Sequence, residues 1–307
     1  MPATMSTTDT DTMHKHQTND MQGILSSMFE GPLAKTYNDR TGGCNIILAN
    51  HLINLTTPHL PAPTEPLRIL DNACGPAVLT TQCMRNEAIT AHQELHISAT
   101  DTSADFITAN RALISSNPNW TCAGRLVDTD VMNGMDLAFP DNTFDVSFTS
   151  LGIFAFPDPV RGAAELYRTL KAGGVAALTT WKRVGWMPLL HEVEQMLQPG
   201  CEPTHFPLVE AWMGRGKLEQ TLRDGGFEDV VEGEVVGHAW WPSVEEAAGR
   251  LAETTRMMVG SGWTVGEKEK MEGGFLDVLR AGGQHVRRGQ GGEVGVEMVA
   301  WTAVAKK

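Results

Sequence analysis

The feature that most constrains the fold of this 307-residue chain is an alternation of short apolar runs with segments of helical periodicity between Leu67 and Thr180. Apolar runs bounded by turn residues predict buried strands, and apolar positions repeating every three to four residues predict helices. Strands that alternate with helices in this way form a parallel sheet with helices on both faces. The predicted strands are 67–71, 95–99, 125–127, 144–149 and 175–180, and the predicted helices are 78–85, 103–116 and 160–170.

The rest of the chain flanks this α/β unit. Residues 1–20 are polar and unpatterned, so we expect a disordered tail there, and residues 21–307 should form one domain. Amphipathic periodicity predicts N-terminal helices within 21–57, and cap helices within 187–215 and 243–285. The remaining predictions are a helix at 218–227, strands at 230–236 and 298–304, and a glycine-rich loop at 282–295.

Composition excludes several classes of protein. The formal net charge of −13 disfavours a nucleic-acid-binding protein of the basic-patch kind. No apolar stretch approaches the roughly 20 residues that a membrane-spanning helix needs, so we expect no membrane segment and a cytoplasmic location. The five scattered cysteines include no Cys-x-x-Cys pair, and we expect neither a disulfide framework nor a metal site. A monomer and a homodimer are both compatible with the sequence.

The most informative local motif is Asp71-Asn72-Ala73-Cys74-Gly75, which directly follows the first predicted strand. In open α/β sheets, ligands bind at the carboxyl ends of the strands, where a loop of small residues lets the backbone approach them. The motif has only Gly75 of the three glycines in the GxGxxG pattern, which argues against a dinucleotide site. A nucleoside-type ligand and a plain tight turn both remain open.

A second acid, Asp101, follows the second predicted strand and lies 26 residues beyond Gly75. A carboxylate at this place can accept hydrogen bonds from both hydroxyls of a ribose. The alternative is that Asp101 caps the helix that begins near Ala104, a role that Ser103 could also fill.

Together, four segments resemble the class I methyltransferases that use S-adenosylmethionine, in their order and spacing over residues 66–182. The resemblance implies a Rossmann-like methyltransferase sheet, mostly parallel with an antiparallel last strand, helices on both faces and an added helical cap. It also implies S-adenosyl-L-methionine as the cofactor. The segments are the loop 71–75, Asp101, 130–145 and 170–174.

Within that superfamily, several segments look like fungal secondary-metabolite methyltransferases, and in particular thiol methyltransferases of the gliotoxin bis-thiomethyltransferase type. The resemblance implies S-methylation of a small dithiol of the epidithiodioxopiperazine kind. O- or N-methylation of a polyketide, a carboxylic acid or an alkaloid stays open, as does a non-methylating cofactor-binding or regulatory protein. The segments are 27–29 with Tyr37, 70–75, 154–158, 180–181 and 185–188.

Carrying the family's roles over by position gives a set of expected site residues. Those expected at the cofactor are Asp71, Ala73, Gly75, Asp101, Thr102, Asn133, Gly134, Thr149 and Tyr37. Those expected at the small-molecule acceptor are Phe29, Phe156, Trp186 and Met187, for which core packing is the alternative.

A catalytic base is not evident in the sequence. A thiol near pKa 8.5 is already partly ionised at neutral pH, whereas an alcohol or phenol needs a positioned base. His191, His205 and His238 are the candidate bases, although a structural role is the more common one for a single histidine. A carboxylate acceptor would favour a cationic side chain, for which Arg183 is the candidate.

Overall fold

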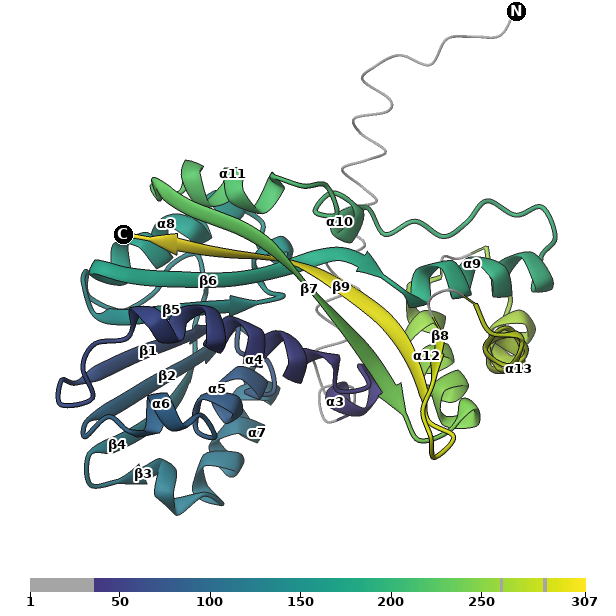
Figure 1. Cartoon of the computed structure of the whole chain (residues 1–307). Helices are drawn as coiled ribbons and strands as arrows, with labels where there is room; N and C mark the ends of the chain where they lie inside the picture. Colours follow the sequence, from purple (N-terminus) through teal and green to yellow (C-terminus); the bar gives the residue numbers. More distant parts are fainter. Residues whose placement is uncertain (1–35, 260–261, 284–285) are drawn as a thin grey trace, which may run out of the picture.

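The computed structural model describes residues 36–259, 262–283 and 286–307 (Figure 1). The expected disordered tail and Phe29 lie outside these residues. So do residues 21–35 of the segment 21–57 in which N-terminal helices are expected. The described part is built on a nine-stranded sheet in which β8 (Val286–Arg288) pairs with β9 at one end. The other strands are, in sheet order, β3 (Thr121–Cys122), β4 (Arg125–Val131), β2 (Leu95–Asp101), β1 (Leu67–Asn72), β5 (Phe144–Ser150), β6 (Leu170–Val184), β9 (Val294–Lys306) and β7 (Asp229–Trp241).

Strands β4, β2, β1, β5 and β6 are parallel to one another, and β9 runs antiparallel between β6 and β7. This arrangement confirms the predicted Rossmann-like sheet with an antiparallel last strand. The predicted strands and helices of the α/β unit are all present, with ends that differ by a few residues.

Helices cover both faces of the sheet because its strands bury side chains on both sides. Along β6, Val175 and Ala177 join the core beneath α4 and α5, while Ala176 and Leu178 join the core beneath α8 and α11. The helices are α3 (Tyr37–Arg40), α4 (Cys44–Thr56), α5 (Val78–Cys83), α6 (Glu87–Thr90), α7 (Ala104–Ser115), α8 (Pro159–Thr169), α9 (Trp186–Leu197), α10 (Pro207–Glu210), α11 (Lys217–Asp224), α12 (Val244–Met258) and α13 (Val265–Ala281).

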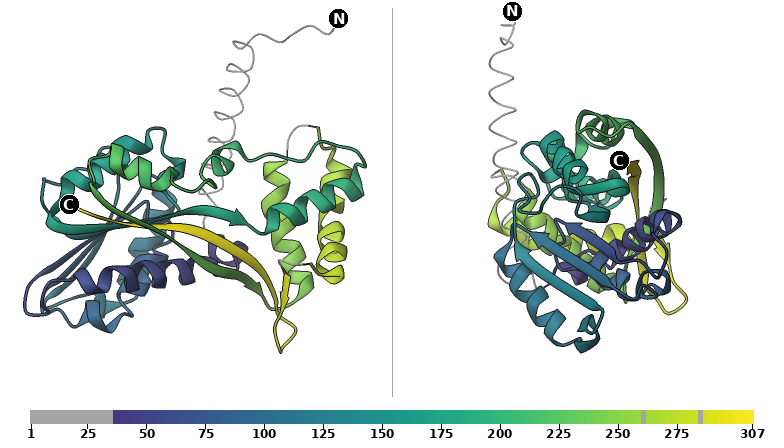
Figure 2. Two further views of the ribbon diagram at one scale, coloured as in Figure 1. Left: turned by 45° about the horizontal axis from the view of Figure 1, so that its top comes forward. Right: turned by 90° about the vertical axis from the view of Figure 1, so that its left-hand side faces the viewer.

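The cap differs from a purely helical addition. Strands β6, β7 and β9 run beyond their predicted ends and out of the α/β half, and α9, α12 and α13 gather around their far ends (Figures 1 and 2). A third core of apolar side chains joins the extended strands to these helices; it includes Trp241, Met271, Phe275 and Val296. The expected glycine-rich loop at 282–295 is wrong in part, because it contains β8 and the start of β9.

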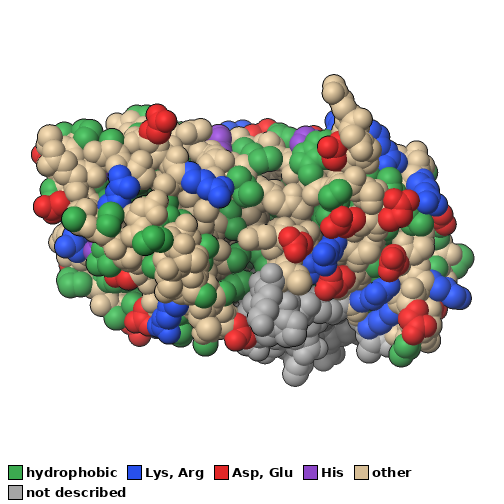
Figure 3. All heavy atoms as spheres, turned by 90° about the horizontal axis from the view of Figure 1, so that it is seen from below, with side chains coloured by type: hydrophobic (Ala, Val, Ile, Leu, Met, Phe, Trp, Pro, Cys, Tyr) green, Lys and Arg blue, Asp and Glu red, His purple; other side chains and the backbone are tan. Residues whose placement is uncertain are grey.

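On the face seen from below, the surface shows no large area of charge of one sign (Figure 3). There, acidic and basic side chains are interspersed over the helical half (Figure 3). No helix in the described part of the chain combines the length and apolar character needed to cross a membrane.

Candidate active site

A cavity of about 490 Å³ lies at the carboxyl ends of β1, β2, β4 and β5. This is the edge where open α/β sheets bind ligands, and the volume is in the range of small-molecule sites. Eight of the nine expected cofactor residues line it: Tyr37, Asp71, Ala73, Gly75, Asp101, Thr102, Asn133 and Gly134. The ninth, Thr149, is fully buried and absent from the described wall, whereas its neighbours Ser150, Leu151 and Gly152 contribute to the wall.

The loop after β1 turns sharply. Ala73 and Gly75 have φ values of 57° and 52°, a left-handed conformation that glycine adopts freely and that costs alanine about 1 kcal/mol. The methyl group of Ala73 is accommodated because Gly152 lies opposite; a Cβ added at Gly152 would come 2.6 Å from the Cβ of Ala73. The methyl group of Ala73 therefore does not close the loop.

Asp71 fastens this loop to the helix that follows. One of its carboxylate oxygens accepts hydrogen bonds from the backbone N–H of Thr80, at 3.1 Å, and from the Thr80 hydroxyl, at 2.7 Å. Burial raises the pKa of Asp71 to about 7, although both bonds from Thr80 act against that rise and the charge of nearby Asp101 adds to it. The side chain is thus both a wall of the cavity and a structural link between β1 and α5.

This raised pKa gives a pH-dependent stability. In the absence of ligand, the folded chain holds a proton on Asp71 that the unfolded chain releases near pH 4. The contribution of this proton to the free energy of unfolding is therefore complete below pH 4 and is lost as the pH rises through about 7. Between pH 6 and 8 we expect a loss of about 1.4 kcal/mol, measured by urea unfolding. Asp71→Asn should reduce that loss; an unchanged pH dependence would contradict the assignment.

Asp101 organises the other side of the loop. One carboxylate oxygen accepts the backbone N–H of Gly75 at 2.9 Å, and the other accepts the N–H of Ser103 at 2.9 Å. Burial raises the pKa of Asp101, against the lowering effect of its backbone hydrogen bonds. Ser103 caps α7 by accepting the N–H of Phe106, so the cap role does not fall to Asp101. Because a carboxylate has about four acceptor positions, Asp101 can also accept a ribose hydroxyl.

Asn133 and Gly134 follow β4 and form the next part of the wall. The Asn133 side-chain oxygen accepts the N–H of Met135 at 3.0 Å, which leaves its amide N–H groups for a ligand. Gly134 packs closely, since an added Cβ would lie 2.5 Å from the ring of Phe156 and 2.8 Å from the Asn72 side chain. Phe156 itself lines this cavity, so the structure places it beside the expected cofactor residues.

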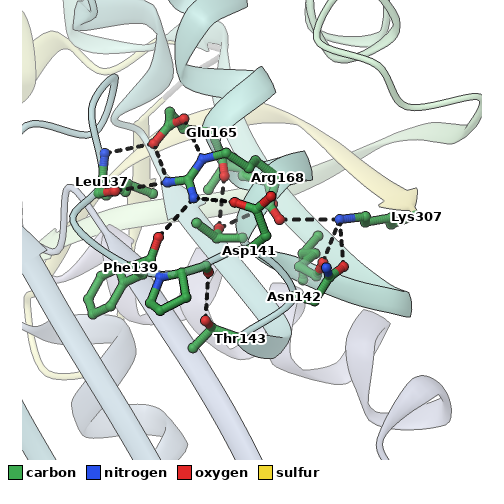
Figure 4. A network of polar contacts seen from close by, with 12 residues as sticks. Leu137, Phe139, Asp141, Asn142, Thr143, Glu165, Arg168 and Lys307 are labelled. Carbon is green, nitrogen blue, oxygen red and sulfur yellow. Dashed lines mark hydrogen bonds and ion pairs between the residues drawn. The ribbon is translucent and has the colours of Figure 1, made fainter.

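The segment after Gly134 is held by Arg168 of α8 (Figure 4). The guanidinium donates to the backbone carbonyls of Leu137 and Phe139 and to the carboxylates of Asp141 and Glu165, all at 2.7–2.8 Å. Glu165 also accepts the N–H of Leu137, and the guanidinium lowers the pKa of Glu165. These bonds fix the path of the chain from the cavity wall to β5.

A second cavity of about 130 Å³ adjoins the first, because Tyr37, Asn45 and Phe154 line both. It lies between α3, the extended strands and the cap helices, and it contains the expected acceptor residues Trp186 and Met187. Its described wall is mostly aromatic and apolar, with Arg40 as the one charged side chain; the other apolar and aromatic members include Trp181, Phe206, Trp241, Leu251, Met258 and Met298.

The candidate bases do not line either cavity in the described structure. A ring nitrogen of His191 lies 3.1 Å from the carbonyl of Thr204, and His205 is exposed beside Glu210. His238 lies on β7 between Gly237 and Ala239, so its side chain is on the opposite face from the cavity residues Ala239 and Trp241. Arg183, the candidate cation for a carboxylate, pairs with Glu297 instead.

Sequence reasoning missed Arg40, Trp241 and Phe206. Arg40 ends a four-residue helix that carries no periodic signal, and Phe206 lies outside regular elements. Trp241 could have been found, since the alternation of buried residues in β7 continues through Val235, Ala239 and Trp241.

A metal centre is not indicated. No cluster of three or more His, Cys, Asp or Glu side chains that could hold a metal occurs among residues 36–259, 262–283 and 286–307. His92 and His96 have a spacing seen in metal sites, but a ring nitrogen of His92 lies 3.0 Å from the Glu65 carbonyl and one of His96 lies 2.8 Å from the Asp128 carboxylate.

Comparison with known proteins places these features in context. Residues 70–178 match a family described as "Methyltransferase domain". The methyltransferase tpcH of Aspergillus fumigatus is 24% identical over 54% of this chain and 59% of its own length. A demethylmenaquinone methyltransferase of Clavibacter sepedonicus is 25% identical over 68% of this chain and 84% of its own length. A ubiquinone biosynthesis O-methyltransferase of Brucella ovis is 27% identical over 46% of this chain and 58% of its own length.

The chain therefore spans less than two thirds of the length of the Aspergillus and Brucella proteins. The matched residues begin within β1 and end within β6, and they contain the loop 71–75, Asp101, Asn133 and the Arg168 network. The Asp101 carboxylate, the Asn133 amide and the apolar residues of the cavity wall together fit the polar and apolar parts of an adenosyl group. The match over residues 70–178, the sheet order and the cavity together support a class I methyltransferase that uses S-adenosyl-L-methionine.

Proposed function

We propose that this chain methylates a thiol of a small, largely apolar secondary metabolite, a dithiol of the epidithiodioxopiperazine kind being the leading candidate. The observation that carries the proposal is the wall of the second cavity, where every described side chain other than Arg40 is uncharged. Tyr37 and Cys44 are the other titratable groups there, and burial raises the pKa of both, that of Cys44 to about 12. Neither can serve as a base at neutral pH.

A thiol needs no such base. Its pKa near 8.5 leaves a few per cent of the thiolate at neutral pH, whereas a phenol near 10 or an alcohol is almost wholly protonated. When bound, S-adenosylmethionine supplies a methyl group on a positively charged sulfur, which is activated towards an anionic nucleophile. The chain's own contribution is then to hold both partners in place and to exclude water.

The residues can divide this work between the two cavities. Asp101 would hold the ribose hydroxyls, and Asn133 would face the adenine. Trp181, Trp186 and Trp241 give the acceptor side large apolar surfaces, and Met187 and Met258 add flexible side chains that adapt to an irregular shape. Tyr37 lies between the two sites, because it lines both cavities.

Methylation on oxygen is the second candidate. It is favoured by the name of the Brucella ovis relative, a ubiquinone biosynthesis O-methyltransferase. The test is a paired screen in which the full chain and S-adenosylmethionine meet a reduced dithiol cyclic dipeptide and its dihydroxy analogue. We expect a methyl sulfide from the dithiol and at least ten times less methyl ether from the diol. The reverse ranking, or methylation of neither, would contradict the proposal.

A further inference from the structure

Glu194 is a fully buried carboxylate on α9, the helix that begins with the cavity residues Trp186 and Met187. Its exposed fraction is 0%, and it is not part of the described wall of either cavity. A carboxylate removed from water is costly unless other groups donate hydrogen bonds to it. The donors that meet Glu194 therefore indicate which part of the chain it holds.

Those donors belong to Thr204. Its backbone N–H donates to Oε2 of Glu194 at 3.0 Å, and its hydroxyl donates to Oε1. An ionised carboxylate only accepts hydrogen bonds, so two donors from one residue match its two oxygens. A ring nitrogen of His191, one turn earlier on α9, lies 3.1 Å from the Thr204 carbonyl. Thr204 is thus attached to α9 through its N–H, its hydroxyl and its carbonyl.

The segment that contains Thr204 leads into the second cavity. After α9 the chain turns back towards α10, and residues 198–206 form neither helix nor strand (Figure 1). Phe206, two residues after Thr204, lines the second cavity and is 2% exposed. Its ring meets that of Trp186 edge to face, with 5.4 Å between the ring centres and 85° between the ring planes.

Other contacts of this segment leave the attachment of Phe206 to α9 with Glu194. The side chain of Gln195 accepts the N–H of Gly200 at 3.1 Å, but this contact is exposed and lies six residues before Phe206. The N–H of Phe206 donates to Glu210 at 2.8 Å, which belongs to α10 and so joins Phe206 to its own following turn. The bonds between Glu194 and Thr204 therefore connect Phe206 to the helix that carries Trp186.

We propose that Glu194 is a positioning residue of the acceptor site: by holding Thr204 against α9, it sets the place of the Phe206 ring and so the shape of the acceptor cavity. This inference rests on the proposed function, since it takes the second cavity as the acceptor site. A cavity of about 150 Å³ takes a single benzene ring, so in a space of about 130 Å³ a shift of one ring in the wall decides what fits.

The test measures binding to the full chain loaded with S-adenosylhomocysteine, and so does not depend on turnover. The probe is benzyl mercaptan, a thiol on one aromatic ring. In calorimetric titration, Glu194→Met should bind the probe about ten-fold more weakly than the wild type and S-adenosylhomocysteine within about two-fold of it. Glu194→Gln keeps one acceptor oxygen and should regain most of the probe affinity. Glu192→Met, which removes an exposed carboxylate from the same helix, should bind as the wild type does.

A double-mutant cycle tests whether Glu194 acts through Phe206. Phe206→Leu should weaken the binding of benzyl mercaptan by itself, because it removes part of the cavity wall. If Glu194 acts by placing that ring, adding Glu194→Met to Phe206→Leu should cause little further loss. Losses that simply add, or a parallel loss of S-adenosylhomocysteine affinity in Glu194→Met, would overturn the positioning role.

A measurement without acceptor follows the ring itself. In fluorine NMR of the full chain labelled with para-fluorophenylalanine, the Phe206 resonance is the one missing from Phe206→Leu. It should move in Glu194→Met, return towards its wild-type position in Glu194→Gln and stay in place in Glu192→Met. An unmoved resonance in Glu194→Met, or no binding of benzyl mercaptan to the wild type, would overturn the inference.

The outcomes separate this inference from the proposed function. Glu194-dependent binding of benzyl mercaptan, with methyl transfer to neither the dithiol nor the diol, would support the role of Glu194 and overturn thiol methylation. Methylation of the dithiol, with equal probe affinities in the wild type and Glu194→Met, would support thiol methylation and overturn the role of Glu194.

Discussion

Asp101→Ala is expected to weaken the binding of S-adenosylhomocysteine by about ten- to hundred-fold, which corresponds to about 1.5–3 kcal/mol. The physical reason is the loss of the two charge-assisted hydrogen bonds that we expect to the ribose, at a carboxylate that also accepts the N–H groups of Gly75 and Ser103. Those two N–H groups would also lose their acceptor, so the loop after β1 should become less ordered. Calorimetric titration measures the affinity directly.

Two further variants make this result specific. Asp101→Asn keeps a side-chain acceptor but removes the charge, so its affinity should fall between those of the wild type and Asp101→Ala. Asp130→Ala removes an exposed carboxylate near the end of the neighbouring strand β4, which pairs with Arg111 and does not line the described cavity. It should bind as the wild type does. Equal affinities for Asp101→Ala and Asp130→Ala would refute the ribose role.

Arg168→Met should lower the free energy of unfolding by about 2–4 kcal/mol, the range for breaking a partly buried network and leaving its acceptors unsatisfied. The change removes the hydrogen-bond donor to the carbonyls of Leu137 and Phe139 and the guanidinium that binds Glu165. Because the same segment begins at the cavity wall, cofactor affinity should fall as well. Urea unfolding and calorimetric titration measure the two effects.

Arg161→Met is the matched control, because Arg161 lies on the same helix, is 60% exposed and reaches Asp136 only at 3.8 Å. An exposed ion pair of this kind contributes about 0–1 kcal/mol, so this variant should unfold nearly as the wild type does. If both arginine variants lose the same stability, the network around Arg168 does not hold this segment in the way described.

Much of the α/β half could be predicted because its signals are local. Each of its strands is a short apolar run that ends at a turn, as in 67–71 before the loop that ends at Gly75. The extended strands were harder, since their outer parts mix apolar and polar residues. β7 continues past the predicted end at residue 236 through Gly237 and His238 to Trp241, and β9 begins next to glycines. Pairing between the strands and packing against α12 and α13, rather than local preference, set these ends.

The same distinction holds for the site. The cofactor residues could be placed because they follow strands at fixed positions, so Asp71, Asp101 and Asn133 come together once the sheet is parallel. The acceptor side depends on how the cap is placed against the α/β half. Arg40 and Trp241 are 201 positions apart and share a cavity through long-range packing alone. No spacing in the sequence encodes that contact.

One measurement tests most directly whether this cavity binds the adenosyl cofactor, namely calorimetric titration of the full chain with S-adenosylhomocysteine near pH 7.5. We expect one molecule bound per chain with a dissociation constant on the order of micromolar, equivalent to about −8 kcal/mol. The unmethylated ligand is used so that the outcome does not depend on knowing the acceptor. A folded protein that binds no S-adenosylhomocysteine at millimolar concentration would contradict both the assigned site and the proposed methyl transfer.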